Sequence, residues 1–206
     1  MLAAASAVFL DRGYSGATMR AVAAKAAVSV PTVELLFATK AGLLKAAIDI
    51  AIAGDDEAVP VLDRAWASAA SEVASVEEFL SVVAGVLAPA QQRSAGLVLA
   101  VFEGAAKDAQ LAELARQMTA QRTATAGWIV DGLTRRVSLR AALSTQEAVD
   151  STWVLMDPAI FDRLTRQRHW TPEQYQRWFA NSLRRLLAPD RPPPPSPSAR
   201  LRRSPR

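Results

Sequence analysis

The sequence predicts an all-α protein with a small N-terminal domain of three helices, a larger helical bundle and a tail without regular structure. Three observations lead to this prediction. Apolar residues recur at steps of three and four along most of the chain, residues that cap helix N-termini precede several of these stretches, and no segment alternates apolar and polar residues as a half-buried strand would. We place the three parts at residues 1–45, 46–188 and 189–206.

The N-terminal segment has the pattern of a helix-turn-helix. Thr18 and Ser29 each precede an apolar ladder, and only Ala27 and Val28 separate the two ladders. Helices this short are marginal in isolation, so they must pack on each other and on the first helix. The second ladder consists of Val30, Val33, Leu36 and Phe37. Helices are predicted over 2–12, 18–26, 30–36 and 40–53.

The middle of the chain is predicted to form the first helices of the bundle. Ser75 and Glu78 form a capping box, in which the hydroxyl accepts a hydrogen bond from a free amide of the first turn. Pro89 is expected to end the helix that begins there. The last helix of this group is expected to contain a polar interruption near Arg122. The predicted segments cover 58–70, 75–87, 96–106 and 108–133.

Two further capping signals begin the C-terminal helices. Ser144 with Glu147 is a second capping box, and Thr171 with Gln174 is a third. Pro172 follows Thr171 at the first helical position, where its missing N–H costs least.

The N-terminal segment resembles the DNA-binding domain of the tetracycline-repressor (TetR) family of transcriptional regulators, densely over 2–44. A weaker similarity over 143–187 is to the last two helices of many members, which form the dimer interface in that family. The residues that carry the resemblance are Phe9, Gly13, Tyr14, Thr18, Val22, Ala23, Ala26, Ala27, Val28, Ser29, Thr32, Phe37, Lys40, Leu43 and Leu44. The resemblance implies a ligand-responsive homodimeric repressor that releases a near-palindromic double-stranded DNA operator when it binds a small molecule.

The predicted DNA contacts follow from the geometry of a helix-turn-helix, whose second helix lies in the major groove with its first turn facing base edges. Apolar atoms of Val30 and Pro31 suit a thymine methyl, and the Thr32 hydroxyl can bind either purine. Thr18, with the free amides of its helix, could hold a phosphate. The family pattern also implies Lys40 as a phosphate contact. The full predicted set is Thr18, Ser29, Val30, Pro31, Thr32, Glu34 and Lys40.

The chain also departs from the family pattern. Ala27 stands where glycine is usual, and a left-handed conformation there would cost alanine on the order of 1 kcal/mol. Glu34 replaces a tyrosine that commonly contacts phosphate. It is interpreted either as an acceptor for cytosine N4 or as a solvated or ion-paired residue on the helix face. The recognition helix has no Lys or Arg, so its electrostatic contribution to affinity is small.

The beginning of the chain leaves two functions open. Met1 falls at an apolar helical position, whereas family members usually have a basic arm before the first helix. Either the natural start lies upstream, or the protein binds DNA weakly. The alternative function is therefore a TetR-like dimeric sensor or interaction protein with weak or lost DNA binding.

The net charge of +4 comes from the tail, where five arginines stand against one aspartate. Within the rest of the chain, residues 1–45 carry +3 and the remainder −3, which favours DNA at the front. The tail has six prolines in its first nine residues and no apolar periodicity, so it is predicted to be disordered and inert, with weak DNA binding as the alternative.

Composition excludes several classes of protein. There is no cysteine, and the single His169 cannot complete a common zinc site, so no metal and no cofactor are expected. The acidic run 55–57 lacks the spacing of a calcium loop. No nucleophile, base and orienting residue converge, so the protein is not expected to be an enzyme. No run of 18 apolar residues occurs, so a cytoplasmic protein without a membrane segment is expected.

Large side chains of the bundle are candidates for a ligand pocket, because they lie in segments that surround such a pocket in the family. The implied ligand is small and mostly apolar or aromatic. Each residue could instead belong to an ordinary core. The candidates are Phe79, Val83, Leu87, Leu99, Phe102, Met118, Trp128 and Trp153.

The C-terminal helices carry more aromatic surface than one small bundle needs. Asp157 and Pro158 are expected to kink or restart the first of them. We predict an isologous four-helix interface between two copies; the alternative is that these stripes pack only on their own subunit. The predicted interface residues are Val149, Trp153, Met156, Ile160, Tyr175, Trp178, Phe179, Leu183 and Leu186.

Overall fold

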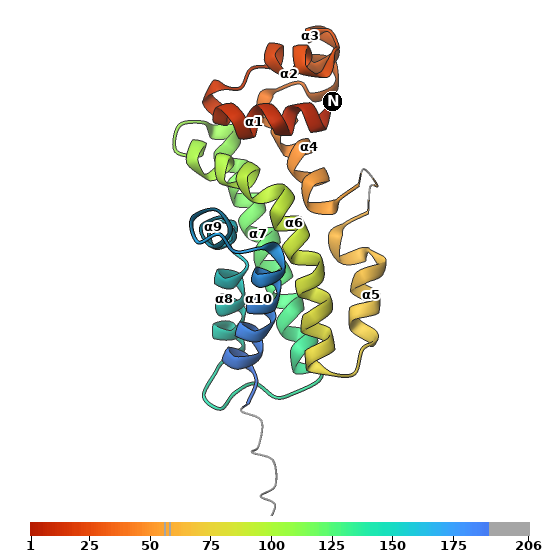
Figure 1. The fold of residues 1–206 in the computed structure, drawn as a ribbon, viewed down its shortest axis with the longest axis vertical. Coiled ribbons are helices and arrows are strands. Elements are labelled where there is room, and N and C mark those ends of the chain that lie inside the picture. The colour runs from red at the N-terminus through yellow and green to blue at the C-terminus, as the bar shows by residue number, and fades with distance from the viewer. Residues whose placement is uncertain (56, 58, 190–206) are drawn as a thin grey trace, which may run out of the picture.

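The computed structural model describes residues 1–55, 57 and 59–189. Over these ranges the chain forms ten α-helices and two short helical turns and contains no strand, which confirms the all-α prediction (Figure 1). The predictions for the tail beyond 189 lie outside the described residues.

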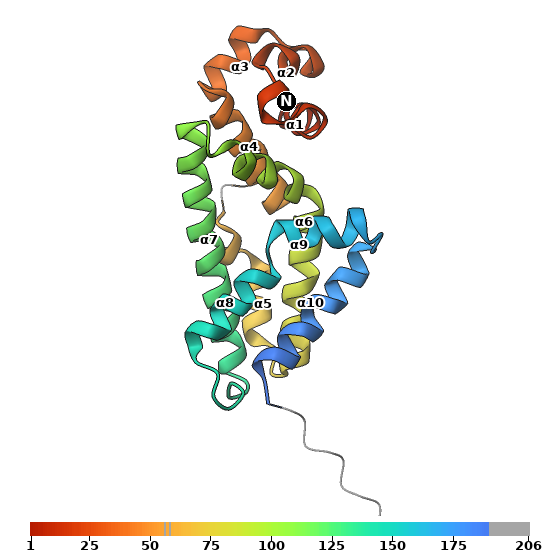
Figure 2. The ribbon, with the colours of Figure 1, turned by 90° about the vertical axis from the view of Figure 1, so that its left-hand side faces the viewer.

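The four predicted N-terminal helices are present as α1 (Leu2–Gly16), α2 (Met19–Ala26), α3 (Val30–Phe37) and α4 (Lys40–Ala53). We call α1, α2 and α3 the head. The head lies at one end of the molecule, and α4 leads from it into the body (Figures 1 and 2). The predicted boundary at residue 45 falls inside α4, which packs on both α1 and α6 of the body. One apolar core joins the two parts, with contributions from Phe9, Val22, Val33, Leu44, Ile48, Leu97, Val101 and Leu111.

Side-chain caps fix the helix-turn-helix as predicted. The Thr18 hydroxyl accepts a hydrogen bond from the Ala21 amide (3.1 Å), and the Ser29 hydroxyl accepts one from the Thr32 amide (3.2 Å). Between the two helices, Ala27 adopts the left-handed conformation, with φ 55° and ψ 40°. The turn has therefore kept the geometry that glycine favours, although an alanine occupies it.

The strain at Ala27 leads to a prediction for stability. We expect Ala27→Gly to raise the free energy of unfolding by about 0.5–1 kcal/mol, because glycine adopts the left-handed region without a steric cost. Ala24→Gly, an exposed position inside α2, is the matched control and should lower it by about 0.5–1 kcal/mol. Urea unfolding followed by circular dichroism measures both changes. A loss of stability in both variants would contradict a strained turn.

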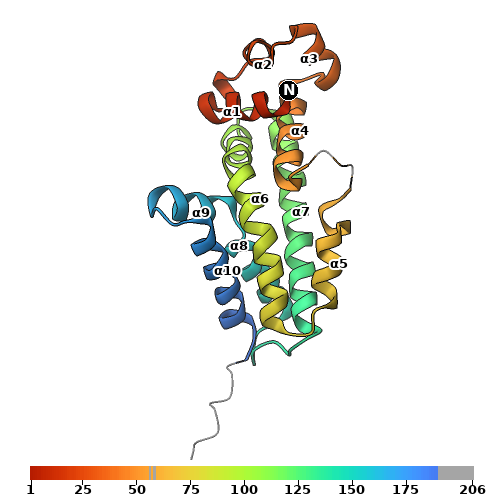
Figure 3. The same ribbon diagram turned by 45° about the vertical axis from the view of Figure 1, so that its right-hand side comes forward.

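The body is built around one long helix. It contains η1 (Val61–Asp63), α5 (Ala65–Glu72), α6 (Val76–Gly104) and α7 (Ala109–Thr134). In Figures 1 and 3, α5 lies on one side of α6 and α7, while α8 and α10 lie on the other.

Two sequence predictions for the body are wrong. The helix that begins after Ser75 does not end at Pro89 but continues to Gly104, so the separate helix predicted over 96–106 is its last part. The proline ring is exposed, whereas Ala88, Ala90 and Gln91 around it are buried in the bundle, and this packing outweighs the lost hydrogen bond. The long helix predicted over 108–133 is confirmed as α7, which is continuous from Ala109 to Thr134 through the polar residues near Arg122.

The C-terminal part consists of α8 (Thr145–Leu155), α9 (Pro158–Asp162), the π-helical turn η2 (Arg163–Gln167) and α10 (Pro172–Leu187). The capping boxes predicted at the starts of α8 and α10 are both complete. The restart predicted at Asp157 and Pro158 is confirmed, since α8 ends at Leu155 and α9 begins at Pro158. α9 turns out of the bundle, and α10 then returns beside α8 along α6 (Figures 1 and 3).

Candidate nucleic-acid interface

α3 presents a free surface at the end of the molecule, where it packs against α2 and α4 (Figures 1 and 2). Val33 is buried beneath it, and the 3.6-residue repeat turns Pro31 and Leu35 to the opposite side. Thr32 and Glu34 flank them and are also exposed. We call these four residues the outer face of α3.

The residues predicted to face bases lie at the start of this helix. The Thr32 hydroxyl is 2.7 Å from the Ser29 hydroxyl, so one hydrogen bond orients it. Pro31 is exposed, as a base contact requires. Val30 is half-buried against the core of the head and offers less free surface than predicted. Base contact by these residues stays a prediction.

Two exposed leucines on α3 were not among the predicted site residues. Leu35 is 86% exposed and Leu36 is 60% exposed. The apolar ladder had grouped Leu36 with the core residues Val33 and Phe37. A helical projection centred on Val33 would have shown that Leu35 lies opposite the core, because two residues turn the helix by about 200°.

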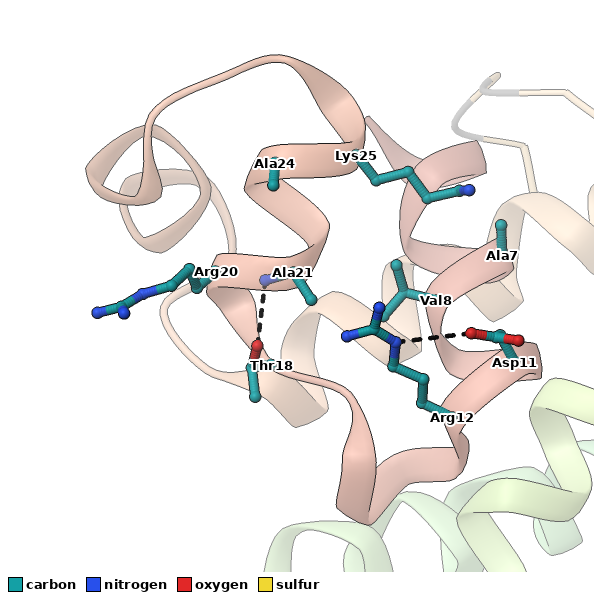
Figure 4. Close-up of a pocket in the computed structure, with 9 residues that line it drawn as sticks. All are labelled: Ala7, Val8, Asp11, Arg12, Thr18, Arg20, Ala21, Ala24 and Lys25. Atoms are coloured by element: carbon teal, nitrogen blue, oxygen red, sulfur yellow. Dashed lines mark hydrogen bonds and ion pairs between the residues drawn. The ribbon is translucent and has the colours of Figure 1, made fainter.

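A basic groove with a volume of about 740 Å³ lies in the head between α1 and α2 (Figure 4). Arg12 and Lys25 reach into the space between the two helices, and Arg20 projects outward from α2, away from α1. Only Asp11 brings a negative charge, 3.5 Å from Arg12. The predicted phosphate contact Thr18 also lines the groove. Sequence reasoning had counted these cations in the charge of the front segment without assigning them to the site.

The side chain of Lys40, the first residue of α4, is used mainly in contacts with the head. Its ammonium donates to the carbonyl oxygens of Tyr14 (2.8 Å) and Ala17 (3.2 Å) and lies 4.1 Å from the centre of the Tyr14 ring. These contacts hold the link between α1 and α2 against the start of α4. An ammonium has three hydrogens, so one remains for the predicted phosphate contact, which stays a prediction.

Tyr14 also connects the head to the body. Its hydroxyl donates to a carboxylate oxygen of Asp108 (3.1 Å), the residue that caps α7. Burial and the neighbouring Asp108 carboxylate raise the pKa of Tyr14 to about 12, so the hydroxyl remains a donor at neutral pH. A continuous set of contacts therefore runs from Lys40 through Tyr14 to the loop between α6 and α7.

The predicted ligand-pocket residues divide into different environments. Phe79 and Val83 are fully buried, with Phe79 packed against Trp128 at 5.8 Å, which favours the core interpretation for both. Phe102 is exposed, and the others are half-buried. None of the eight lines the groove of Figure 4 or a second pocket of about 250 Å³. The second pocket is lined by Gln91, Gln92, Ala95, Gly96, Phe161, Asp162, Thr165, Arg166 and Pro172.

Trp153 of α8 lies in a polar setting that its sequence position did not predict. The Arg122 guanidinium lies 3.7 Å from the centre of its ring and pairs with Asp157 at 2.8 Å. Burial lowers the pKa of Arg122, and the Asp157 carboxylate opposes this effect. The Nε1 of Trp153 and the Nε of Arg122 are buried donors without a partner among the described residues.

The predicted dimer interface requires a correction. Met156, Tyr175, Phe179 and Leu183 are buried in the core of their own subunit, so they have almost no surface to offer a partner. The periodic stripe was correctly identified, but α6 covers that part of it. Leu186 is 50% exposed, and Val154, which was not predicted, is equally exposed. The remaining predicted residues, Val149, Trp153, Ile160 and Trp178, are half-buried.

Other kinds of site find little support in the described part of the chain. It contains no group of three His, Cys, Asp or Glu residues arranged to hold a metal ion. Asp55 of the acidic run pairs with Arg64 (2.5 Å), whose guanidinium lowers the pKa of Asp55 to about 2. None of the helices within residues 1–55, 57 and 59–189 combines the length and apolar character needed to cross a bilayer.

Known proteins resemble the chain at two levels. Residues 1–47 match the model of a family described as bacterial regulatory proteins, tetR family. No curated protein sequence matches the chain. A Rhodococcus sp. protein described as a TetR-family transcriptional regulator has a similar fold, with a TM-score of 0.67 and 16% identity over 91% of this chain and 96% of that one.

Two further solved structures are similar over most of their length. A transcriptional regulator from Saccharomonospora viridis, in complex with choline, gives a TM-score of 0.65 with 14% identity over 90% of this chain and 94% of that one. NalD from Pseudomonas aeruginosa, the secondary repressor of the MexAB-OprM multidrug efflux pump, gives a TM-score of 0.61 with 17% identity over 91% and 94%.

A helix-turn-helix with a free outer face, joined to an all-α body, defines a DNA-binding transcriptional regulator. The N-terminal domain belongs to the tetracycline-repressor (TetR) family, and the chain as a whole has the fold of that family's regulators. The resemblance predicted from the sequence is confirmed.

Proposed function

We propose that the protein is a homodimeric repressor that binds a near-palindromic operator and releases it when a small molecule binds the body. The observation that carries this proposal is the position of the outer face of α3. It lies at the end of the molecule with Pro31, Thr32, Glu34 and Leu35 exposed. The cations Arg12, Arg20 and Lys25 line the groove between α1 and α2, the helix against which α3 packs. Such a surface offers base contacts at its centre and phosphate contacts at its rim.

The second subunit would dock on α8 and α10. These helices lie side by side on one side of α6 and α7, and each carries a half-exposed apolar residue, Val154 on α8 and Leu186 on α10. Two such pairs related by a twofold axis form a four-helix interface. The two copies of α3 would then meet half-sites about 34–36 Å apart, one turn of DNA.

The effector is proposed to be small and mostly apolar or aromatic, and to bind between α7 and α8 near Trp153. The unpartnered Trp153 Nε1 suits a hydrogen-bond acceptor on such a molecule. The regulator from Saccharomonospora viridis was solved with choline, which is compatible with a small ligand in this fold. The contact between Tyr14 and Asp108 gives a path from the body to the head, and a coupling of about 1–3 kcal/mol is typical of such responses.

Selection of bound sequences from a random DNA pool at two salt concentrations tests the proposal. We expect enrichment of an inverted repeat. The logarithm of the DNA-binding constant falls as the logarithm of the salt concentration rises. If Arg20 neutralises one phosphate, Arg20→Met should make this negative slope shallower by about 0.9 for each subunit. Arg135→Met, an exposed arginine at the end of α7 far from the head, should leave the slope unchanged. Operator binding that is insensitive to Thr32→Ala and Lys40→Ala together would contradict the assigned contact surface.

A further inference from the structure

The outer face of α3 is apolar at its centre, which is unusual for a surface that meets a polyanion. α3 has the sequence VPTVELLF and contains no cationic side chain. Leu35 is its most exposed large apolar residue, at 86%. The cations that flank this helix in the chain are Lys25 on α2 and Lys40 at the start of α4. Positive charge is therefore supplied by neighbouring helices, and the apolar middle of the surface must recognise its target by other means.

Leu35 and Pro31 form one continuous apolar strip. They are four residues apart, so they lie on the same side of the helix, opposite Val33. Their separation along the axis is about 6 Å, from a rise of 1.5 Å per residue. Thr32 lies beside this strip with its hydroxyl held by Ser29. When α3 enters the major groove, Leu35 comes into reach of base edges beyond those that the first turn meets.

Base edges in the major groove offer one apolar group, the C5-methyl of thymine. The other groups at these edges are hydrogen-bond donors and acceptors, which an isobutyl side chain can only desolvate. We propose that Leu35 is a specificity-determining residue that reads thymine methyl groups, so that each operator half-site carries thymine under the second turn of α3. This inference rests on the proposed DNA-binding function and adds the chemistry of the bases that are read.

Replacement of thymine by deoxyuridine tests this proposal, because it removes the methyl group and leaves base pairing unchanged. In the operator obtained by selection, each thymine is replaced in turn and the dissociation constant is measured with wild-type protein. At the thymine that Leu35 contacts, we expect binding to weaken about fourfold, the effect of one buried methyl group. Leu35→Ala should bind the thymine and deoxyuridine operators equally well at that position.

Leu36→Ala is the matched control, since it removes the same atoms from the neighbouring exposed residue of α3. It should retain the difference between thymine and deoxyuridine. Loss of this difference in Leu36→Ala but not in Leu35→Ala would overturn the assignment, as would an operator that contains no methyl-sensitive thymine. If Leu35→Ala kept the wild-type difference between thymine and deoxyuridine operators, the assignment would also be overturned. The exposed leucines would then be assigned to contact with a protein partner. Absence of any selected operator would instead refute the proposed function.

Discussion

Leu186→Glu is expected to convert the protein into a monomer and to weaken operator binding by at least about 100-fold. The side chain is 50% exposed on α10, beside the buried Leu183 and Leu187 that hold this helix on the body. A carboxylate there would be buried without a partner in a four-helix interface, at a cost of about 3–5 kcal/mol. Since 1.4 kcal/mol is a factor of ten, the dimer should dissociate at working concentrations.

Size-exclusion chromatography with light scattering gives the oligomeric state, and a gel shift gives the affinity for the operator. Leu186→Lys should also be monomeric, because its charge would likewise be buried in the interface. A cation is favourable near a helix C-terminus, so this variant disrupts the interface without destabilising α10. Leu35→Glu is the reciprocal control: it should remain dimeric and lose operator binding by repulsion from the phosphates. Dimers in both Leu186 variants would contradict an interface at this position.

Gly132→Ala is expected to lower the free energy of unfolding by about 1–3 kcal/mol, because it adds a methyl group to a filled part of the body. A Cβ at this position would clash with Cζ of the Phe79 ring and would lie 2.8 Å from its Cε2. The ring is fully buried, with Trp128 at 5.8 Å on one side and the Arg136 guanidinium at 4.4 Å on another, so it has little room to move. The crossing of α6 and α7 would therefore have to open.

Gly127→Ala is the matched control on the same helix. A Cβ there meets no atom within 4 Å, so the change should raise the free energy of unfolding by about 0.5–1 kcal/mol, because alanine restricts the unfolded chain and favours helix. Thermal and urea unfolding of both variants measure the change in the free energy of unfolding, which we expect to be negative for Gly132→Ala and positive for Gly127→Ala. Equal effects from the two substitutions would show that the contact between Phe79 and Gly132 does not limit the packing of α6 on α7.

Local chemistry determined the parts of the structure that the sequence predicted well. A cap needs only a hydroxyl and the amide two or three residues beyond it, so Thr18, Ser29, Ser144 and Thr171 could be assigned without knowledge of the fold. The left-handed turn at Ala27 was instead suggested by the family pattern, which usually has glycine at this position, and the structure shows it. Together these signals predicted the helix-turn-helix and therefore the class of protein.

Contacts between distant segments decided the rest. Pro89 is a local signal for a helix end, yet α6 continues because its flanking residues are buried against other helices. The stripe of Tyr175 and Phe179 has the same period whether it faces α6 or a second subunit, and only the packing shows that it faces α6.

For the candidate site, too, some features follow from local sequence and others depend on contacts between distant segments. The sequence by itself determined where the helix-turn-helix lies and predicted which of its helices meets DNA, because capping and spacing act within a few residues. Only the tertiary structure decided that Lys40 holds Tyr14 and Ala17, that Arg12 and Lys25 reach into one groove from two helices, and that Leu35 remains exposed. The physical reason is that exposure and partnership of a side chain depend on every element packed around it, which periodicity along one helix does not specify.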